Sequence, residues 1–257
     1  MHAMINIALR AAHEAADTII QAIERPDRIK IYEKGENDFV TDVDQEVENT
    51  LIYHIQKAYP THSFLCEESG LTEGEDKDTV WIIDPIDGTR NFIRGFPHFC
   101  ISIACIQQGK LQHAVILDPI RGDEFVATKG GGAQLNNTKI RVGKSTSLQT
   151  SVISFSTAGK RNHEKSLELQ SKLLGKTGGL RFTGSSALDL AYVAAGRLDA
   201  GWMAGMQKWD TAAGILLVQE AGGLISDSSG NPDCLDSDNL VFSNPRCFKQ
   251  LLKVVSE

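Results

Sequence analysis

Trp81-Ile82-Ile83-Asp84-Pro85-Ile86-Asp87-Gly88-Thr89-Arg90-Asn91-Phe92 is the stretch that decides the fold, because an apolar run meets two carboxylates, a glycine and a hydroxyl there. Residues 80–83 are β-branched and aromatic, which predicts the end of a buried strand. Proline donates no hydrogen bond to a ladder, so we expect the strand to end before Pro85. Asp84 then lies at the strand end, and the bend lets Asp87 point back toward the same place.

Two interpretations of these aspartates stay open from this stretch alone. Asp-Pro and Asp-Gly are turn dipeptides of many surface loops, which favours an ordinary turn. Carboxylates that follow an interior strand are rare unless they are paired or bind a metal ion. Gly88 and Thr89 add backbone N–H groups at the start of a predicted short helix, and such groups suit an anion. A functional site therefore needs partner residues elsewhere in the chain.

The composition is that of an ordinary globular protein, with 41% hydrophobic and 23% charged residues among 257, and it excludes disordered and membrane proteins. His13, Glu14 and Asp17 interrupt the apolar N-terminal region, so we expect no signal peptide, no membrane span and a cytoplasmic location. Five cysteines without CxxC spacing predict reduced, buried thiols. A net charge of −7 argues against non-specific nucleic-acid binding and means that a phosphate ligand would need bound cations.

Hydrophobic periodicity predicts helices and strands along the whole chain. The predicted helices are 4–23, 42–59, 163–174, 186–195, 210–220 and 245–257. The predicted strands are 63–66, 80–83, 99–106, 114–117, 124–128, 152–155, 180–183, 200–204 and 224–226. Residues 107–110 and 118–123 resemble hairpin connections, so part of the sheet is expected to be antiparallel. The pattern divides the chain into an α+β half over 1–150 and an α/β half over 151–257, closely packed as one unit.

The entry to the second predicted helix holds another candidate carboxylate. Thr41 or Asp42 is expected to cap the helix by accepting hydrogen bonds from its first backbone N–H groups. Asp44 lies in the first turn and is explained less well as a cap. We therefore expect that the side chain of Asp44 can reach into a neighbouring site.

Three more acids lie at the ends of predicted elements. Glu67 and Glu68 follow the strand at 63–66, which repeats the pattern of acids after an apolar strand, although Glu68 can also be read as a solvated loop residue. Asp210 is predicted to be the N-cap of the helix at 210–220. A carboxylate at a helix start can cap and bind a ligand, so the two interpretations of Asp210 are compatible.

Three motifs in this order resemble the inositol monophosphatase family: Glu67-Glu68-Ser69, the stretch from position 81 to position 92, and Trp209-Asp210-x-Ala212-Ala213-Gly214. Asp38-Phe39-Val40-Thr41-x-x-Asp44, Gly184-Ser185-Ser186-Ala187-Leu188-Asp189-Leu190-Ala191 and Glu220-Ala221-Gly222-Gly223 extend the resemblance over nearly the whole chain. Within the family the chain resembles a bacterial branch, one member of which is also a ribosomal-RNA antitermination factor. The resemblance implies an α+β fold, the layered α-β-α-β-α sandwich of sugar phosphatases, and a homodimer.

The activity implied by this resemblance is that of a Mg²⁺-dependent, lithium-sensitive phosphomonoesterase for inositol monophosphate or a similar small polyol or sugar phosphate. Attack by a metal-activated water would hydrolyse the ester, without a covalent phosphoenzyme. The implied ligands of two or three Mg²⁺ ions are Glu67, Asp84, the backbone carbonyl of Ile86, Asp87 and Asp210. The implied catalytic residues are Glu67, Asp44 and Thr89, in which Thr89 is hydrogen-bonded to Asp44 and orients the water. The implied substrate-binding residues are Gly88, Thr89, Asp87, Ser186 and Asp210.

Two positions depart from the family pattern and enlarge the list of possible substrates. Arg90 replaces a threonine and would either contact phosphate or point outward to a partner. Met203 stands where the inositol enzymes place a glutamate that binds a sugar hydroxyl, and a thioether accepts hydrogen bonds weakly. Lys208 adds a positive charge nearby. Sugar bisphosphates, 3′-phosphoadenosine nucleotides and NADP are therefore alternative substrates, and transcription-antitermination factors are alternative partners.

Overall fold

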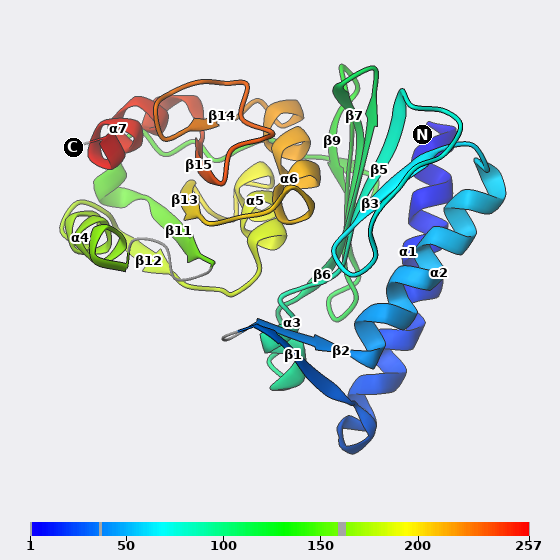
Figure 1. Ribbon diagram of the computed structural model, residues 1–257. Coiled ribbons are helices and arrows are strands. Elements are labelled where there is room, and N and C mark those ends of the chain that lie inside the picture. Colours follow the sequence, from blue (N-terminus) through cyan, green and yellow to red (C-terminus); the bar gives the residue numbers. More distant parts are fainter. Residues whose placement is uncertain (1, 36–37, 159–162, 257) are drawn as a thin grey trace.

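The computed structural model describes residues 2–35, 38–158 and 163–256 (Figure 1). Its helices are α1 (Ala3–Ile23), η1 (Pro26–Arg28), α2 (Asp42–Ala58), α3 (Thr89–Ile93), η2 (Leu148–Thr150), α4 (His163–Leu174), α5 (Ser186–Ala194), α6 (Lys208–Glu220) and α7 (Pro245–Ser256). Its strands are β1 (Ile31–Gly35), β2 (Asp38–Thr41), β3 (Ser63–Cys66), β4 (Gly70–Thr72), β5 (Thr79–Asp87), β6 (Cys100–Gln107), β7 (Lys110–Asp118), β8 (Asp123–Thr128), β9 (Gly132–Leu135), β10 (Thr138–Lys139), β11 (Val152–Thr157), β12 (Gly179–Arg181), β13 (Ala200–Ala204), β14 (Leu224–Asp227) and β15 (Asn239–Ser243).

The larger sheet has eight strands in the order β10-β9-β8-β7-β6-β5-β3-β4, and it is antiparallel except where β3 pairs with β5. Alternate residues of a strand point to opposite faces, and both faces of β5 are buried. Trp81 and Ile83 pack in a core with α1 and α2, while Ile82 packs in a second core with α5 and α6. Helices therefore cover both faces of this sheet (Figure 1).

The smaller sheet has five strands in the order β12-β11-β13-β15-β14, with β11 parallel to β12 and to β13. Met203 and Phe242 of this sheet share the second core with α5 and α6. Phe155 and Val241 pack on the other side against α4 and α7. The layers are therefore α1/α2, sheet, α5/α6, sheet and α4/α7, which confirms the expected α-β-α-β-α sandwich (Figure 1).

The second core contains residues from both sides of position 150, so the division of the chain into two halves stays a prediction. All five cysteines are buried and unpaired, as predicted. Among the described residues, no helix is long and apolar enough to cross a membrane.

The strand β5 does not end before Pro85, which is a correction to the prediction. Asp84 pairs with Ser102 and Asp87 with Cys100, so one strand uses three steps where its partner uses two. The extra residue is a bulge, and a residue within a bulge can lack the ladder hydrogen bond that proline cannot donate. The bulge lets β5 carry both aspartates while it remains paired with β6.

The sequence also missed the paired strands β1 and β2 and the inner strand β15. All of β1 is exposed, so its residues lack the apolar alternation that identifies a half-buried strand. β15 pairs on both sides, with β13 and β14. Its residues Leu240, Val241 and Phe242 are all buried, so this inner strand is a short apolar run without the alternation of a half-buried strand.

Gly214 lies where the two helices of the middle layer pack tightly against each other. A Cβ atom at Gly214 would lie 2.4 Å from the Cβ atom of Leu190 on α5. We predict that Gly214→Ala lowers the free energy of unfolding by about 1–3 kcal/mol, because two packed helices would have to separate. Urea denaturation of Gly214→Ala and of Gly175→Ala, whose new Cβ would meet no atom closer than 3.8 Å, makes the comparison. A gain of stability in Gly214→Ala, as in an unpacked helix, would contradict this account of the middle layer.

Candidate metal centre

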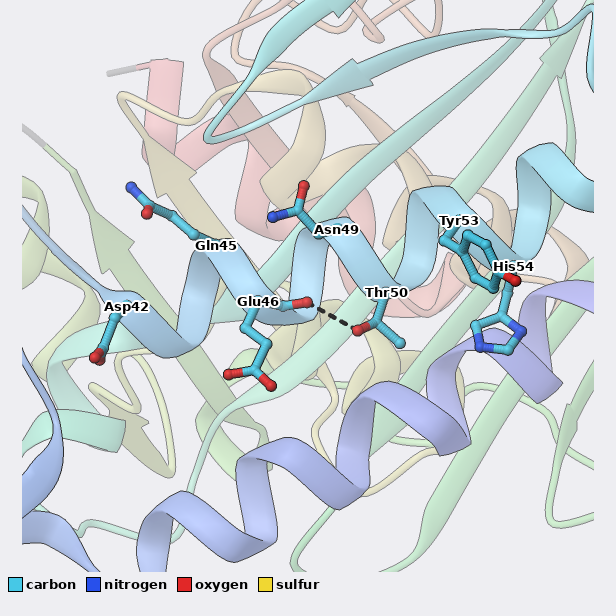
Figure 2. Close-up of a pocket in the computed structure, with 7 residues that line it drawn as sticks. All are labelled: Asp42, Gln45, Glu46, Asn49, Thr50, Tyr53 and His54. Carbon is cyan, nitrogen blue, oxygen red and sulfur yellow. Dashed lines mark hydrogen bonds between the residues drawn. The ribbon is translucent and has the colours of Figure 1, made fainter.

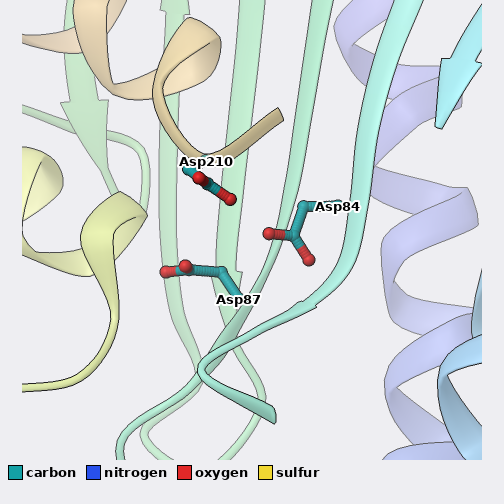
Figure 3. A group of neighbouring side chains, drawn as sticks. All are labelled: Asp84, Asp87 and Asp210. Carbon is teal, nitrogen blue, oxygen red and sulfur yellow. The ribbon is translucent and has the colours of Figure 1, made fainter. Parts of the chain in front are cut away.

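Three carboxylates from two elements converge at the end of β5 (Figure 3). Asp84 and Asp87 lie on the bulged end of the strand, and Asp210 lies in the first turn of α6. One oxygen of each carboxylate lies within 4.8 Å of the others. Asp84 is 2% and Asp87 is 7% exposed, whereas Asp210 is partly buried. The three side chains thus form a cluster of negative charge that is largely removed from water.

The first turn of α5 holds Asp87. The Ser185 hydroxyl donates to Oδ2 of Asp87, the Ala187 N–H donates to the same oxygen at 2.8 Å, and the Ser186 N–H donates to Oδ1 at 3.3 Å. Burial raises the pKa of Asp87, and these hydrogen bonds oppose that rise. The positive end of the α5 dipole therefore fixes and partly stabilises the ionised carboxylate.

Asp84 is held by the chain that follows it, since its Oδ1 accepts the N–H of Ile86 at 3.0 Å. Its pKa is raised well above the ordinary value by burial and then by the negative charges of its neighbours, which are Glu67, Asp87 and Asp210. A divalent cation would remove this repulsion, and several carboxylate oxygens from different elements are the donor set that Mg²⁺ accepts. The residues present therefore fit a Mg²⁺ site.

Glu67 follows β3 and lies beside Asp84. Burial raises the pKa of Glu67 to about 7, while the nearby Lys34 ammonium lowers it in part. Lys34 Nζ lies 3.6 Å from Oε1 of Glu67 and 2.5 Å from Oε1 of Glu68. The reading of Glu68 as a solvated loop residue is wrong, because its side chain is 8% exposed and pairs with a lysine carried by β1.

Asp44 links α2 to the end of β5. Thr41 is the N-cap of α2, and Oδ2 of Asp44 accepts the Thr41 N–H at 2.8 Å and the Thr41 hydroxyl at 2.5 Å. Oδ1 of Asp44 accepts the Thr89 hydroxyl at 3.3 Å, and that hydroxyl also lies 3.0 Å from the carbonyl oxygen of Ile86. Asp44 therefore completes a capping box with one oxygen and faces the end of β5 with the other.

Gly88 occupies a position that a residue with a side chain could not take without strain. Its φ is +99°, and an added Cβ would lie 3.1 Å from the carbonyl oxygen of Gly184 and 3.2 Å from that of His98. The turn therefore brings the backbone of α3 close to the segment that precedes α5. The predicted contacts of Gly88 and Thr89 with a phosphate group stay predictions.

Two expectations about the residues around α6 are wrong. The N-cap of α6 is Gln207, and Asp210 lies three residues farther on, where its Oδ2 accepts the Gln207 N–H at 2.7 Å. Met203 is fully buried in the core between the sheets and cannot touch a substrate in this structure. Met203 was chosen from its distance to Trp209 in the sequence. The pairing of β13 inside the smaller sheet, however, puts the Met203 side chain in the apolar layer.

The other predicted substrate residues lie in different surroundings. Ser186 is partly buried, and its hydroxyl donates to Sδ of Met206 at 3.0 Å. Arg90 is exposed on α3. Lys208 forms an ion pair with Asp236, so its charge is not an isolated positive charge for a substrate. A substrate-binding role of Ser186 and of Arg90 stays a prediction.

Glu48, which the sequence motifs did not predict as a site residue, holds the turn that carries Glu67. Glu48 is 3% exposed, and its two carboxylate oxygens accept the N–H groups of Glu68 and Ser69, each at 2.9 Å. Asp44 and Glu48 are one helical turn apart, on the stripe that also holds the buried Val47. Two acids on the apolar stripe of an amphipathic helix were the available signal.

Two surface pockets lie away from these carboxylates. Figure 2 shows a pocket of about 500 Å³ along the outer side of α2, lined by Asp42, Gln45, Glu46, Asn49, Thr50, Tyr53 and His54. A second pocket of about 380 Å³ lies between the end of α1 and the start of α2. Neither pocket is lined by a predicted metal ligand.

Comparisons with known proteins identify relatives of this chain. A sequence profile of the inositol monophosphatase family matches residues 1–257. The Nus factor SuhB of Pseudomonas aeruginosa is 48% identical over 261 residues, which cover 99% of this chain and 96% of that protein. The crystal structure of the extragenic suppressor protein suhB of Bartonella henselae superposes with a TM-score of 0.97 at 36% identity, over 100% of this chain and 99% of that one. SaIMPase-II bound to inositol monophosphate superposes with a TM-score of 0.82 at 26% identity, over 98% and 93% of the two chains.

The raised pKa values predict how stability depends on pH. Glu67 titrates near pH 4.5 when unfolded and near 7 in the metal-free fold, and the pKa values of Asp84 and Asp87 are raised in the same direction. The metal-free protein should therefore lose stability as the pH rises from about 4.5 to 7, because the unfolded chain gives up these protons first. Mg²⁺ binds the ionised carboxylates, so its stabilising effect should grow over the same range.

Thermal unfolding at pH 5 and pH 8, with Mg²⁺ or with NaCl at equal ionic strength, measures this effect. We expect Mg²⁺ at about 100 times its Kd to raise the Tm by roughly 5–10 °C at pH 8. The shift should be much smaller at pH 5. A shift that is equal at both pH values, or larger at pH 5, would contradict the assignment of the buried carboxylates as ligands.

Proposed function

The chain belongs to the inositol monophosphatase family, and we propose on this premise that it is a Mg²⁺-dependent phosphomonoesterase for inositol monophosphate or a similar small polyol or sugar phosphate. The observation that carries the proposal is the convergence of Asp84, Asp87 and Asp210 within 4.8 Å. Buried acids at this density need a cation, and the family relationship supports phosphate ester hydrolysis as the use of that cation.

We assign the metal to Glu67, Asp84, Asp87 and Asp210, together with the main-chain carbonyl of Ile86, as ligands of two or three Mg²⁺ ions. Bound Mg²⁺ would supply Lewis-acid stabilisation of phosphate oxygens and make a water molecule more acidic. Hydrogen bonds from α5 favour the ionised form of Asp87 against the effect of burial, and the capping interaction of Asp210 fixes its carboxylate at the start of α6. These contacts hold two of the proposed ligands ready for a cation.

Thr89 and Asp44 are proposed to orient the attacking water. Ionised Asp44 and the Ile86 carbonyl only accept hydrogen bonds, so the Thr89 hydroxyl donates to Asp44 at 3.3 Å or to the Ile86 oxygen at 3.0 Å. With its own proton directed to one of these acceptors, the Thr89 oxygen keeps a lone pair that can accept a hydrogen bond from the attacking water. The backbone N–H groups of Gly88 and Thr89 are proposed to bind phosphate at the start of α3.

Fewer residues remain as candidates for contact with the substrate. Ser186, Asp87, Asp210 and Arg90 remain candidate contacts, while the burial of Met203 removes it. The inositol monophosphate bound to SaIMPase-II supports a polyol phosphate as substrate. Sugar bisphosphates, 3′-phosphoadenosine nucleotides and NADP remain alternatives within the same chemistry, and we also propose lithium inhibition, a homodimer and a cytoplasmic location.

A second candidate function is the binding of transcription-antitermination factors. The name Nus factor, carried by a relative that is 48% identical over nearly the full length, favours it. Asp84→Asn should still capture such factors from purified components, because this function needs the surface of the protein and not the metal. Capture by neither the wild type nor the variant would remove this candidate.

We predict that phosphate release from inositol 1-phosphate requires Mg²⁺ and falls when Li⁺ is added. Asp87→Asn should lower kcat/KM by at least about 100-fold, because it removes the charge on which the α5 hydrogen bonds converge. Glu73→Gln is the matched control, since Glu73 is exposed and forms an ion pair with Lys77 at 2.6 Å on the surface.

The same assay on a panel of sugar bisphosphates, 3′-phosphoadenosine nucleotides and NADP identifies the substrate. Metal-dependent turnover that survives in Asp87→Asn would contradict the ligand assignment. Turnover restricted to a nucleotide would overturn the polyol assignment and leave the reaction class intact.

A further inference from the structure

Another buried carboxylate, that of Asp189, lies next to the metal centre and is not among its proposed ligands. Asp189 is fully buried on α5, one turn beyond the residues that bind Asp87. Its Oδ1 accepts the Thr183 hydroxyl and its Oδ2 accepts the Ser156 hydroxyl, each at 2.8 Å. Burial raises the pKa of Asp189 to about 7. A buried acid bonded to two neutral hydroxyls is costly, so its position needs an explanation beyond packing.

One of its two partners leads directly to the centre. Thr183 begins the short segment that turns into α5, and Ser185, Ser186 and Ala187 of this segment and of the first turn supply three hydrogen bonds to Asp87. The carbonyl oxygen of Thr183 also accepts the side-chain amide of Asn91 at 2.9 Å. The segment is thus held by Asn91 of α3 at its backbone and by Asp189 at its side chain.

The turn itself has little freedom. Gly184 has a φ of +82°, and an added Cβ would lie 2.9 Å from Nδ2 of Asn91. The backbone between Thr183 and Ser185 is therefore packed against α3 with no room to shift in that direction. The hydroxyl of Thr183 fixes the remaining direction, because it donates to Asp189 of α5 at 2.8 Å and accepts the Ser185 N–H at 3.4 Å.

We propose that Asp189 is a positioning residue, which through Thr183 fixes the first turn of α5 and thereby aims its hydrogen-bond donors at Asp87. Both oxygens of Asp87 accept bonds from this turn, so a shift of the turn redirects the carboxylate. Groups that orient a metal ligand typically change metal affinity by about 10–100-fold when they are removed. The inference rests on the proposed function, since it takes Asp87 to be a Mg²⁺ ligand.

The two hydroxyls on Asp189 provide a matched pair of variants. Thr183→Val and Ser156→Ala each remove one hydrogen bond from the same carboxylate, but only Thr183 is joined to the residues that hold Asp87. Ser156 lies on β11 in the smaller sheet. The Thr183 hydroxyl also accepts the Ser185 N–H at 3.4 Å, so Asp189→Ala, which leaves that bond in place, separates the role of Asp189 from that of Thr183. If Asp189 only stabilised the fold, Asp189→Ala should leave Mg²⁺ binding unchanged. If it positions Asp87, Asp189→Ala and Thr183→Val should both weaken the centre, Ser156→Ala should not, and Thr183→Ser should restore it.

Calorimetric titration of Mg²⁺ into the wild type and into each of these variants tests the proposal. Thr183→Val should weaken Mg²⁺ binding by about 10–100-fold, whereas Ser156→Ala and Thr183→Ser should stay within about 3-fold of the wild type. Thr183→Ala makes the same comparison if the valine variant does not fold. Equal losses in Thr183→Val and Ser156→Ala would overturn the positioning role.

Hydrogen exchange at the Ala187 amide gives a second readout that needs no metal. This N–H donates to Asp87 at 2.8 Å, so its exchange should accelerate in Thr183→Val and not in Ser156→Ala. A wild type that binds no Mg²⁺ would defeat the proposed function, while the exchange rates would still decide whether Asp189 positions the turn. Equal exchange at Ala187 in both variants would overturn the inference.

Discussion

Mutual repulsion of buried carboxylates is the constraint on which this structure depends. Asp84, Asp87 and Asp210 bring oxygens within 4.8 Å of one another, and Glu67 adds a fourth charge beside Asp84. Each acid alone would be costly to bury, and together they raise one another's proton affinity. Hydrogen bonds from helix starts and one lysine offset part of this cost. The remaining negative charge is what makes the cluster a receptor for divalent cations.

The layered fold explains how acids so far apart in sequence reach one place. Strand β5 of the larger sheet ends in the bulge that carries Asp84 and Asp87. The helices α5 and α6 of the middle layer begin near that end of the strand. On the opposite face, α2 contributes Asp44 to the Thr89 hydroxyl and Glu48 to the turn that carries Glu67. Both faces of one sheet thus support one centre, and the packing of α6 through Gly214 fixes the layer from which Asp210 extends.

The sequence predicted the parts of the centre that depend on local patterns and missed those that depend on packing. Acids after apolar strands located Asp84, Asp87 and Glu67, an acid at a helix start located Asp210, and the family resemblance added the layered fold. The prediction that Met203 contacts the substrate was wrong, because spacing within a motif does not reveal which neighbours bury a strand residue. Glu48 and Ser185 act through contacts between elements far apart in the chain, which only the fold brings together. Pro85 misled because a bulge lets a strand contain a proline.

Anomalous diffraction from a crystal soaked in Mn²⁺, an ion that takes the same oxygen ligands as Mg²⁺, tests the central claim most directly. The account predicts a strong peak between β5 and α6, about 2 Å from carboxylate oxygens of Asp84, Asp87 and Asp210, and loss of that peak in Asp87→Asn. A fully soaked crystal with no peak at this position, or with its main peak at another acidic surface, would contradict the claim that these buried carboxylates form the metal centre.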